Sequence, residues 1–221
     1  MSVITPTKKN IIQPGHIKKY SSSLRLWHWT NMLVITGSLL TVLLNATILK
    51  GRNDAPVIKS ALQKAGAVVT DAQVKAATHD LSDNVWDVHV YFGYGLAALL
   101  LFRMILEFFQ LADQKFIRVL KTAQHNFLSV KKRREATRHE LAVKIIYAVF
   151  YLLLLMMVIT GLFLAFEDFF EPYKAIRHTV KDVHNFGMYI MLAFITVHVI
   201  GVLLAERKDS KGIISDMING G

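Results

Sequence analysis

Four apolar stretches, each long enough to cross a lipid bilayer, constrain the fold of this chain more than any other feature. They run over residues 26–48, 85–111, 141–166 and 183–205. About 20 apolar residues cross the hydrocarbon core as a helix, because a helix pairs its backbone N–H and C=O groups internally. With 53% hydrophobic residues among 221, the composition is that of a membrane protein. We therefore predict an all-α, integral membrane four-helix bundle, with residues 26–205 as its transmembrane domain.

Basic residues predict how these helices are oriented. Sixteen Lys and Arg residues lie in the segments 1–25, 112–140 and 206–221, against eight in the loops 50–84 and 167–182. Because Lys and Arg accumulate in cytoplasmic loops, both termini and the connection 112–140 are expected on the cytoplasmic side. The first 25 residues lack the apolar core of a signal peptide and are expected to remain on the protein. The basic connection then reflects topology and anionic lipid, and no nucleic-acid binding is expected.

The outer loop 50–84 is long for a connection between membrane helices. An amphipathic pattern near residues 56–77 predicts a short helix within it, with Thr70 and Asp71 as cap residues. We expect this loop either to dock a partner on the outer side or to cover the bundle.

Four histidines lie within the apolar stretches, where an ionisable side chain is costly and therefore indicates function. They are His28, His89, His184 and His198. The last two are fourteen residues apart, which is about four helical turns and about 21 Å. One helix face thus carries an imidazole near each side of the bilayer. In the predicted topology, His28 and His198 lie at the cytoplasmic depth, and His89 and His184 lie at the outer depth.

Each pair could supply both axial ligands of one haem iron, leaving it six-coordinate and suited to electron transfer. We therefore expect two haems b, the inner iron bound by His28 and His198 and the outer iron by His89 and His184. The chain contains no cysteine, which excludes thioether-linked haem and cysteine-bound iron–sulfur clusters within it. The third helix has no such histidine and is expected to buttress the bundle.

A glycine follows three of these histidines by three or four residues: Gly93, Gly187 and Gly201. Each leaves a bare patch on the histidine's own helix face, against which a porphyrin can lie. The alternative is that these glycines only allow close packing between membrane helices.

Two arginines, Arg25 and Arg103, are expected to pair with haem propionates. For Arg103 the alternative is that its side chain extends to the interface beside Glu107. The remaining histidines lie in polar loops and are expected to be solvated: His16, His79, His125, His139 and His178.

Several short sequence motifs, most of them containing one of the four histidines, follow one another along the chain. They are Arg25-Leu26-Trp27-His28-Trp29 with Thr36-Gly37, His89 with Gly93-Tyr94, Thr160-Gly161-Leu162, His184-Asn185-Phe186-Gly187-Met188-Tyr189, and His198-Val199. Together they resemble the bacterial di-haem cytochrome b family, which includes prokaryotic cytochrome b561 and the b-type cytochrome subunit of nickel-iron hydrogenases. The tail 214–220 is most similar to the hydrogenase branch. That branch usually has a more elaborate third loop and an extra histidine near the first ligand of the fourth helix, and this chain has neither.

The resemblance implies electron transfer between a periplasmic-side oxidoreductase, with iron–sulfur clusters or haem of its own, and menaquinone or ubiquinone. It also implies a multi-pass protein of the bacterial cytoplasmic (inner) membrane, and an electron-transfer, quinone-reactive subunit rather than a complete enzyme. We expect the quinone near the inner haem, within reach of Arg25, Trp29, Thr30 and Asn31.

Two alternatives remain open. One is a stand-alone b561-type shuttle for quinol, superoxide or a small soluble redox partner. The other is a histidine-lined metal transporter, which the absence of cysteine and the location of most acidic residues in the loops disfavour.

Overall fold

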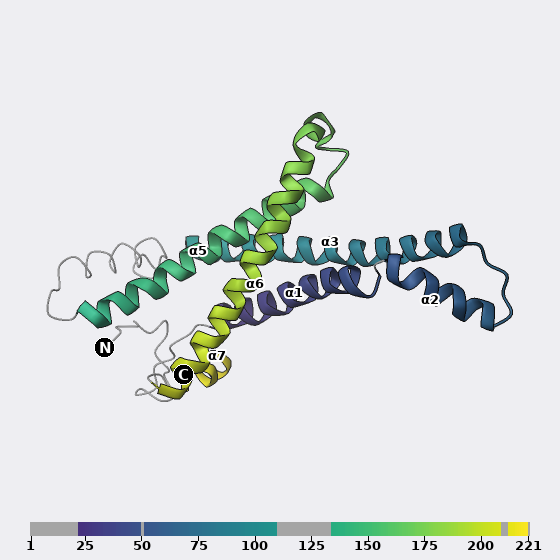
Figure 1. Ribbon diagram of the computed structural model, residues 1–221. Coiled ribbons are helices and arrows are strands. Elements are labelled where there is room, and N and C mark those ends of the chain that lie inside the picture. Colours follow the sequence, from purple (N-terminus) through teal and green to yellow (C-terminus); the bar gives the residue numbers. More distant parts are fainter. Residues whose placement is uncertain (1–21, 50, 110–133, 209–211, 221) are drawn as a thin grey trace. The chain divides into compact units, whose positions relative to one another are not determined.

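The computed structural model describes residues 22–49, 51–109, 134–208 and 212–220. Within these ranges every regular element is helical (Figure 1). The elements are α1 (Ser22–Thr47), α2 (Gly51–Lys64), α3 (Asp71–Phe109), α5 (Arg134–Ala165), the 3-10 helix η3 (Glu171–Ile176), α6 (Arg177–Lys208) and α7 (Ile213–Asn219). The expected all-α class is confirmed. Most of the predicted N-terminal segment 1–25 and of the predicted connection 112–140 lies outside the described residues.

Four of the described helical segments are long and apolar enough to cross a membrane, as the sequence predicts. They are Ser22–Thr47, Asp71–Leu106, Lys144–Ala165 and Glu171–Arg207. Large apolar side chains on them are widely exposed, with Leu33 64%, Leu152 69% and Val197 64% accessible. Such extensive apolar exposure is unfavourable in water and is the expected condition of a surface in contact with lipid.

By its internal contacts the chain divides into two compact units, Thr30–Ala98 and the combination of Met1–Trp29 with Leu99–Gly221. In the unit Thr30–Ala98, Gly37 of α1 lies against the ring of Phe92 on α3, where a Cβ atom would clash. Nearer the outer end predicted for these helices, the Ser82 hydroxyl donates a hydrogen bond to Asn45 Oδ1 at 3.1 Å. The glycine therefore allows close approach of α1 and α3.

The connection 50–84 contains the helix α2 and the first turns of α3 rather than one short helix. Helix α2 ends in a Schellman motif: Gly66 has φ 87°, and the N–H groups of Gly66 and Ala67 donate to the carbonyls of Gln63 and Leu62 at 3.0 Å. The single helix predicted near residues 56–77 is wrong, because this glycine stops α2. Residues 71–84, expected in the loop 50–84, are instead the first turns of α3.

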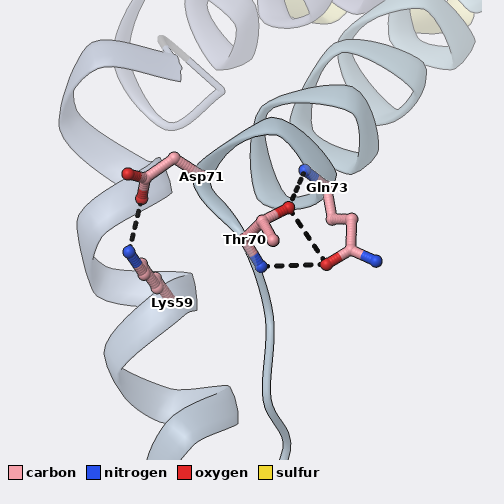
Figure 2. Close-up of polar contacts among 4 residues, drawn as sticks. All are labelled: Lys59, Thr70, Asp71 and Gln73. Carbon is pink, nitrogen blue, oxygen red and sulfur yellow. Dashed lines mark hydrogen bonds and ion pairs between the residues drawn. The ribbon is translucent and has the colours of Figure 1, made fainter.

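Thr70 begins α3 with a capping box (Figure 2). Its backbone N–H donates to Gln73 Oε1 at 2.9 Å, and its hydroxyl accepts from the Gln73 N–H at 3.3 Å. Asp71 follows at the first helical position and pairs with Lys59 of α2 at 2.6 Å. Of the two residues predicted to cap a helix near 56–77, Thr70 thus caps the start of α3, and Asp71 is the first residue of that helix.

In the second unit, α5 packs against α6, and both η3 and α7 also contact α6. The interior of this unit includes Leu153 and Leu154 of α5 and Met191 of α6. Arg177 at the start of α6 donates to the Leu164 carbonyl at 3.1 Å and pairs with Glu167. Helices α5 and α6 therefore form a contiguous helical hairpin, and α6 begins six residues before the predicted start at residue 183.

Candidate functional site

The rings of His28 on α1 and His198 on α6 lie side by side in the same unit. Their centroids are 6.4 Å apart and their planes are inclined by 56°. The Nδ1 atom of His28 is buried and has no hydrogen-bond partner among the described residues. Two imidazoles from helices distant in sequence thus approach each other, with no direct hydrogen bond between them in the described structure.

Aromatic side chains hold both rings of this pair. The ring of Phe194, one turn before His198 on α6, stacks on His198 with centroids 6.0 Å apart and planes 6° from parallel. Phe150 of α5 stacks on Phe194 in turn at 5.0 Å. On α1, the Trp29 ring meets His28 edge to face at 5.2 Å. The planes of the two imidazoles are therefore set by packing.

Arg25 and Arg103 both belong to the unit that contains this pair. Arg25 donates to the carbonyl of Ile218 and to Ser22 Oγ, while its Nε atom is buried without a hydrogen-bond partner in the described structure. Arg103 Nε donates to the hydroxyl of Tyr151 at 2.9 Å, and its guanidinium carbon lies 5.8 Å from the centre of the Tyr151 ring. The side chain of Glu107, the alternative partner of Arg103, lies outside the described side chains.

A second aromatic contact connects Tyr151 with the residue before His28. The Trp27 ring lies 5.7 Å from the Tyr151 ring, and Trp27 Nε1 donates to the Leu99 carbonyl at 2.9 Å. Trp27 is buried. Arg103, Tyr151 and Trp27 thus form one connected cluster beside the start of α1.

His89 of α3 is held by α1 within the unit Thr30–Ala98. Its Nδ1 atom lies 3.0 Å from Thr41 Oγ1 and 3.3 Å from the Ser38 carbonyl oxygen. Thr41 donates its own hydroxyl proton to that same carbonyl at 2.6 Å. The Thr41 hydroxyl oxygen can then only accept, and the Ser38 hydroxyl also lies 3.3 Å from Nδ1. The contacts with Thr41 and the Ser38 carbonyl favour a proton on Nδ1, which leaves the lone pair on Nε2.

His184 of α6 is held in the same way by α5. Its Nδ1 atom lies 2.8 Å from Thr160 Oγ1, and the Thr160 hydroxyl donates to the Met156 carbonyl at 2.7 Å. A Cβ atom on Gly161 would lie 3.3 Å from His184 Cε1, so the bare glycine gives the ring room against α5. This tautomer, with its second nitrogen unprotonated, is the form of histidine that binds a metal ion.

The three glycines beside the histidines have different surroundings. A Cβ atom on Gly93 or Gly201 would meet no atom of the described structure within 4 Å, whereas one on Gly187 would clash with Met156 and Met157. Gly187 therefore serves the packing of α6 on α5, which was the alternative considered for it. Gly93 and Gly201 instead have open space beside them in the described structure.

The other histidines within the described part of the chain are surface groups. His79 pairs with Asp83 at 2.8 Å and His178 with Asp182 at 3.0 Å, all four side chains being at least 59% accessible. His79 lies on α3 and His178 on α6, not in loops as expected. His16, His125 and the side chain of His139 fall outside what the structure describes.

Four residues in direct contact with the site are absent from the candidates named from sequence: Thr41, Thr160, Phe194 and Tyr151. A hydroxyl within a membrane helix and a ring one turn from a histidine are signals in the sequence, although weak ones. Across the described ranges, no group of three or more His, Cys, Asp or Glu residues is arranged to hold a metal ion. The described structure instead brings two histidines together, His28 and His198.

Comparison with known proteins gives one family. The family model of prokaryotic cytochrome b561 matches residues 19–220, which includes all four histidines and the helices that carry them. No curated protein and no solved structure matches the chain. The chain therefore belongs to the prokaryotic cytochrome b561 family, and it is a multi-pass membrane cytochrome b, of a kind that binds haem b and transfers electrons across the membrane.

Proposed function

We propose that this cytochrome holds two haems b, one near each side of the bilayer, and conducts electrons between them. His28 and His198 are the axial ligands of the inner haem, and His89 and His184 are those of the outer haem. The observation that carries this proposal is the separation of 6.4 Å between the His28 and His198 ring centroids.

This separation fits two imidazoles on opposite sides of one metal ion. A metal–nitrogen bond is about 2.0–2.1 Å long. Since an imidazole nitrogen lies about 1.1 Å from its ring centre, two such ligands in line place their centroids about 6.3 Å apart. The buried, unpartnered Nδ1 of His28 and Nε of Arg25 further favour a polar group absent from the protein itself, since buried polar atoms are rarely left unpaired.

The hydrogen bonds at Nδ1 of His89 and His184 support the proposal that these residues bind the outer haem. Thr41 and Thr160 each accept the Nδ1 proton of a histidine, which leaves Nε2 as the coordinating nitrogen. His89 and His184 lie on different helices and at the same predicted depth, near the outer side. In both residues, a threonine hydroxyl bound at Nδ1 therefore leaves Nε2 available for coordination.

A bound haem b supplies one-electron chemistry, and ligation by two histidines excludes oxygen from the iron. The protein's own contribution is to hold the four imidazoles, to keep water out with the surrounding aromatic rings, and to place cationic groups near the propionates. Arg25 and Arg103 are the proposed partners of the inner propionates. Arg103 is held by Tyr151, which fixes the direction of its guanidinium.

We further propose that the electrons pass between a periplasmic-side oxidoreductase and the quinone pool in the bacterial cytoplasmic membrane, with both termini cytoplasmic. The excess of basic residues in segments 1–25, 112–140 and 206–221 supports this orientation. Asn31 follows His28 by three residues in the sequence, and its buried Oδ1 accepts no hydrogen bond from the described residues. Such an oxygen suits the hydroxyl of a quinol, whereas Arg25 and Trp29 already donate to backbone carbonyls.

The decisive experiment is quantification of haem b per chain in the detergent-purified protein, combined with reduced-minus-oxidised spectra. We expect two low-spin haems in the wild type and one in each of His28→Ala and His89→Ala. The matched control is His178→Ala, a solvent-exposed histidine paired with Asp182, which should retain two. One haem in the wild type, or two in either ligand variant, would contradict the proposal.

The partner is tested separately by purification from the native membrane. A metalloenzyme subunit that co-purifies and reduces the haems supports the role as a subunit. Reduction by quinol with no such subunit present would instead support the stand-alone shuttle.

A further inference from the structure

The short C-terminal helix α7 (Ile213–Asn219) lies against the start of α1. Trp29 Nε1 donates to the Met217 carbonyl at 3.1 Å, and the Arg25 guanidinium donates to the Ile218 carbonyl. Both carbonyls lie in the last turn of α7, where backbone oxygens have no partner within the helix. Two side chains of α1 thus cap the C-terminal end of α7, and a cation is favourable there.

The opposite end of α7 is bound by α6. The Glu206 carboxylate accepts hydrogen bonds from the N–H groups of Gly212 at 2.8 Å and Ile214 at 3.1 Å. Gly212 adopts φ 90°, a left-handed conformation that glycine tolerates and that turns the chain into α7. Hydrogen bonds to a carboxylate are stronger than neutral ones, so this attachment is firm.

These two attachments lie close to both histidines of the inner pair. Arg25 and Trp29 flank His28 in sequence, and the Trp29 ring contacts the His28 imidazole. Glu206 lies eight residues after His198 on α6, which is just over two helical turns. Helix α7 therefore bridges the two helices that carry the inner ligands.

We propose that α7 is a clamp that keeps His28 and His198 at ligand spacing, with Trp29, Arg25 and Glu206 as positioning residues. This inference rests on the proposed ligation of a haem by that pair. The indole of Trp29 is central to it, because its ring contacts the His28 imidazole and its only hydrogen-bond donor binds α7. Loss of the clamp would free the cytoplasmic end of α1 from α6, and the inner haem would be lost or reoriented while the outer haem stayed.

The first test is deletion of residues 212–221, with haem content and the low-spin EPR signal of each haem as readouts. The His89→Ala protein, which retains the inner site, assigns the inner signal. We expect about one haem per chain in the deletion variant, with the outer signal unchanged. Two haems with unaltered signals, or equal loss of both haems, would overturn the clamp.

Trp29→Phe is the finer test, because it keeps an aromatic ring beside His28 and removes only the N–H donor. One hydrogen bond is worth about 0.5–1.5 kcal/mol, so we expect release of the inner haem to apomyoglobin to be about two- to tenfold faster. The inner EPR signal should shift and the outer one should not. Should the deletion variant fail to fold, this variant and Glu206→Gln decide the question alone.

Trp86→Phe is the matched control. The Trp86 ring meets His89 edge to face at 5.4 Å, as Trp29 meets His28, but its indole N–H donates to none of the described residues. It should leave the inner haem unchanged. A wild type without an inner haem refutes the proposed function itself, whereas a wild type with two haems and an unaffected Trp29→Phe protein refutes only the clamp.

Discussion

Thr160 Oγ1 lies 2.8 Å from Nδ1 of His184 and at the same time donates its proton to the carbonyl of Met156. A threonine in this position cannot donate to the imidazole, so it fixes the histidine tautomer. Thr41 does the same for His89 by donating to the Ser38 carbonyl. One chemical device, a membrane-helix threonine bonded to its own backbone, therefore prepares both proposed ligands of the outer haem.

The variant Thr160→Val removes this acceptor and keeps the shape of the side chain. Loss of such a partner to a metal-bound histidine typically weakens metal binding by about 10- to 100-fold, so we expect the outer haem to be retained that much less tightly. Thr160→Ser should restore it. Haem titration of the apoprotein, read in the outer-haem spectrum, measures the effect.

Thr196→Val is the control for this substitution. Thr196 on α6 also donates to the carbonyl one turn earlier, that of Leu192 at 2.9 Å, but it forms no hydrogen bond with a histidine in the described structure. It should not alter either haem. An equal loss of the outer haem in both variants would mean that the hydroxyl stabilises the helix and not the ligand.

Phe194 fixes the plane of the His198 imidazole, with which it is stacked within 6° of parallel. Phe194→Leu keeps the apolar volume and removes the flat ring, so His198 gains rotational freedom. We expect two haems to remain and the EPR signal of the inner one to broaden or shift, because that signal depends on the angle between the two ligand planes. Phe169→Leu, which changes a 77% exposed ring, should have no such effect; an unchanged inner signal in Phe194→Leu would exclude this role.

Two glycines of α6 are expected to respond differently to alanine. In Gly187→Ala the new methyl group meets Met156 and Met157, and since thioether chains can rearrange, the cost should be about 1–2 kcal/mol of stability. In Gly201→Ala the methyl group meets no atom of the described protein, so thermal stability of the apoprotein should not fall. If a macrocycle lies on Gly201, haem binding at the inner site should nevertheless weaken, and unchanged haem affinity would rule that contact out.

The sequence was sufficient for the helical class and the number of membrane-length helices, because hydropathy over about 20 residues is a strong and local signal. It was less successful at the ends of those helices. The start of α3 could have been predicted from the sequence, because Thr70 and Gln73 have capping-box spacing and Gly66 is a typical helix stop. An amphipathic pattern that continued across this break led instead to one helix.

Helix periodicity and loop charges predicted that His28 and His198 lie at the same depth, but not the separation of their rings. The contacts of Thr160 with His184, and of α7 with α1, could not be anticipated. The first depends on how closely α5 approaches α6, and the second on a chain reversal at Gly212 whose direction no local pattern fixes. Long-range packing decides both.

Arg103 provides the last prediction, because it is a charge inside a membrane helix whose Nε is bound by the Tyr151 hydroxyl at 2.9 Å. A cation near a haem favours the reduced state, so Arg103→Gln should lower the midpoint potential of the inner haem. A tenfold change in the equilibrium corresponds to about 59 mV for one electron, and we expect a decrease of that order. Tyr151→Phe should give a smaller decrease, since the charge remains but its direction is no longer fixed. Redox titration of each haem measures the shift in both variants. A shift confined to the outer haem would contradict the placement of Arg103 beside the inner haem.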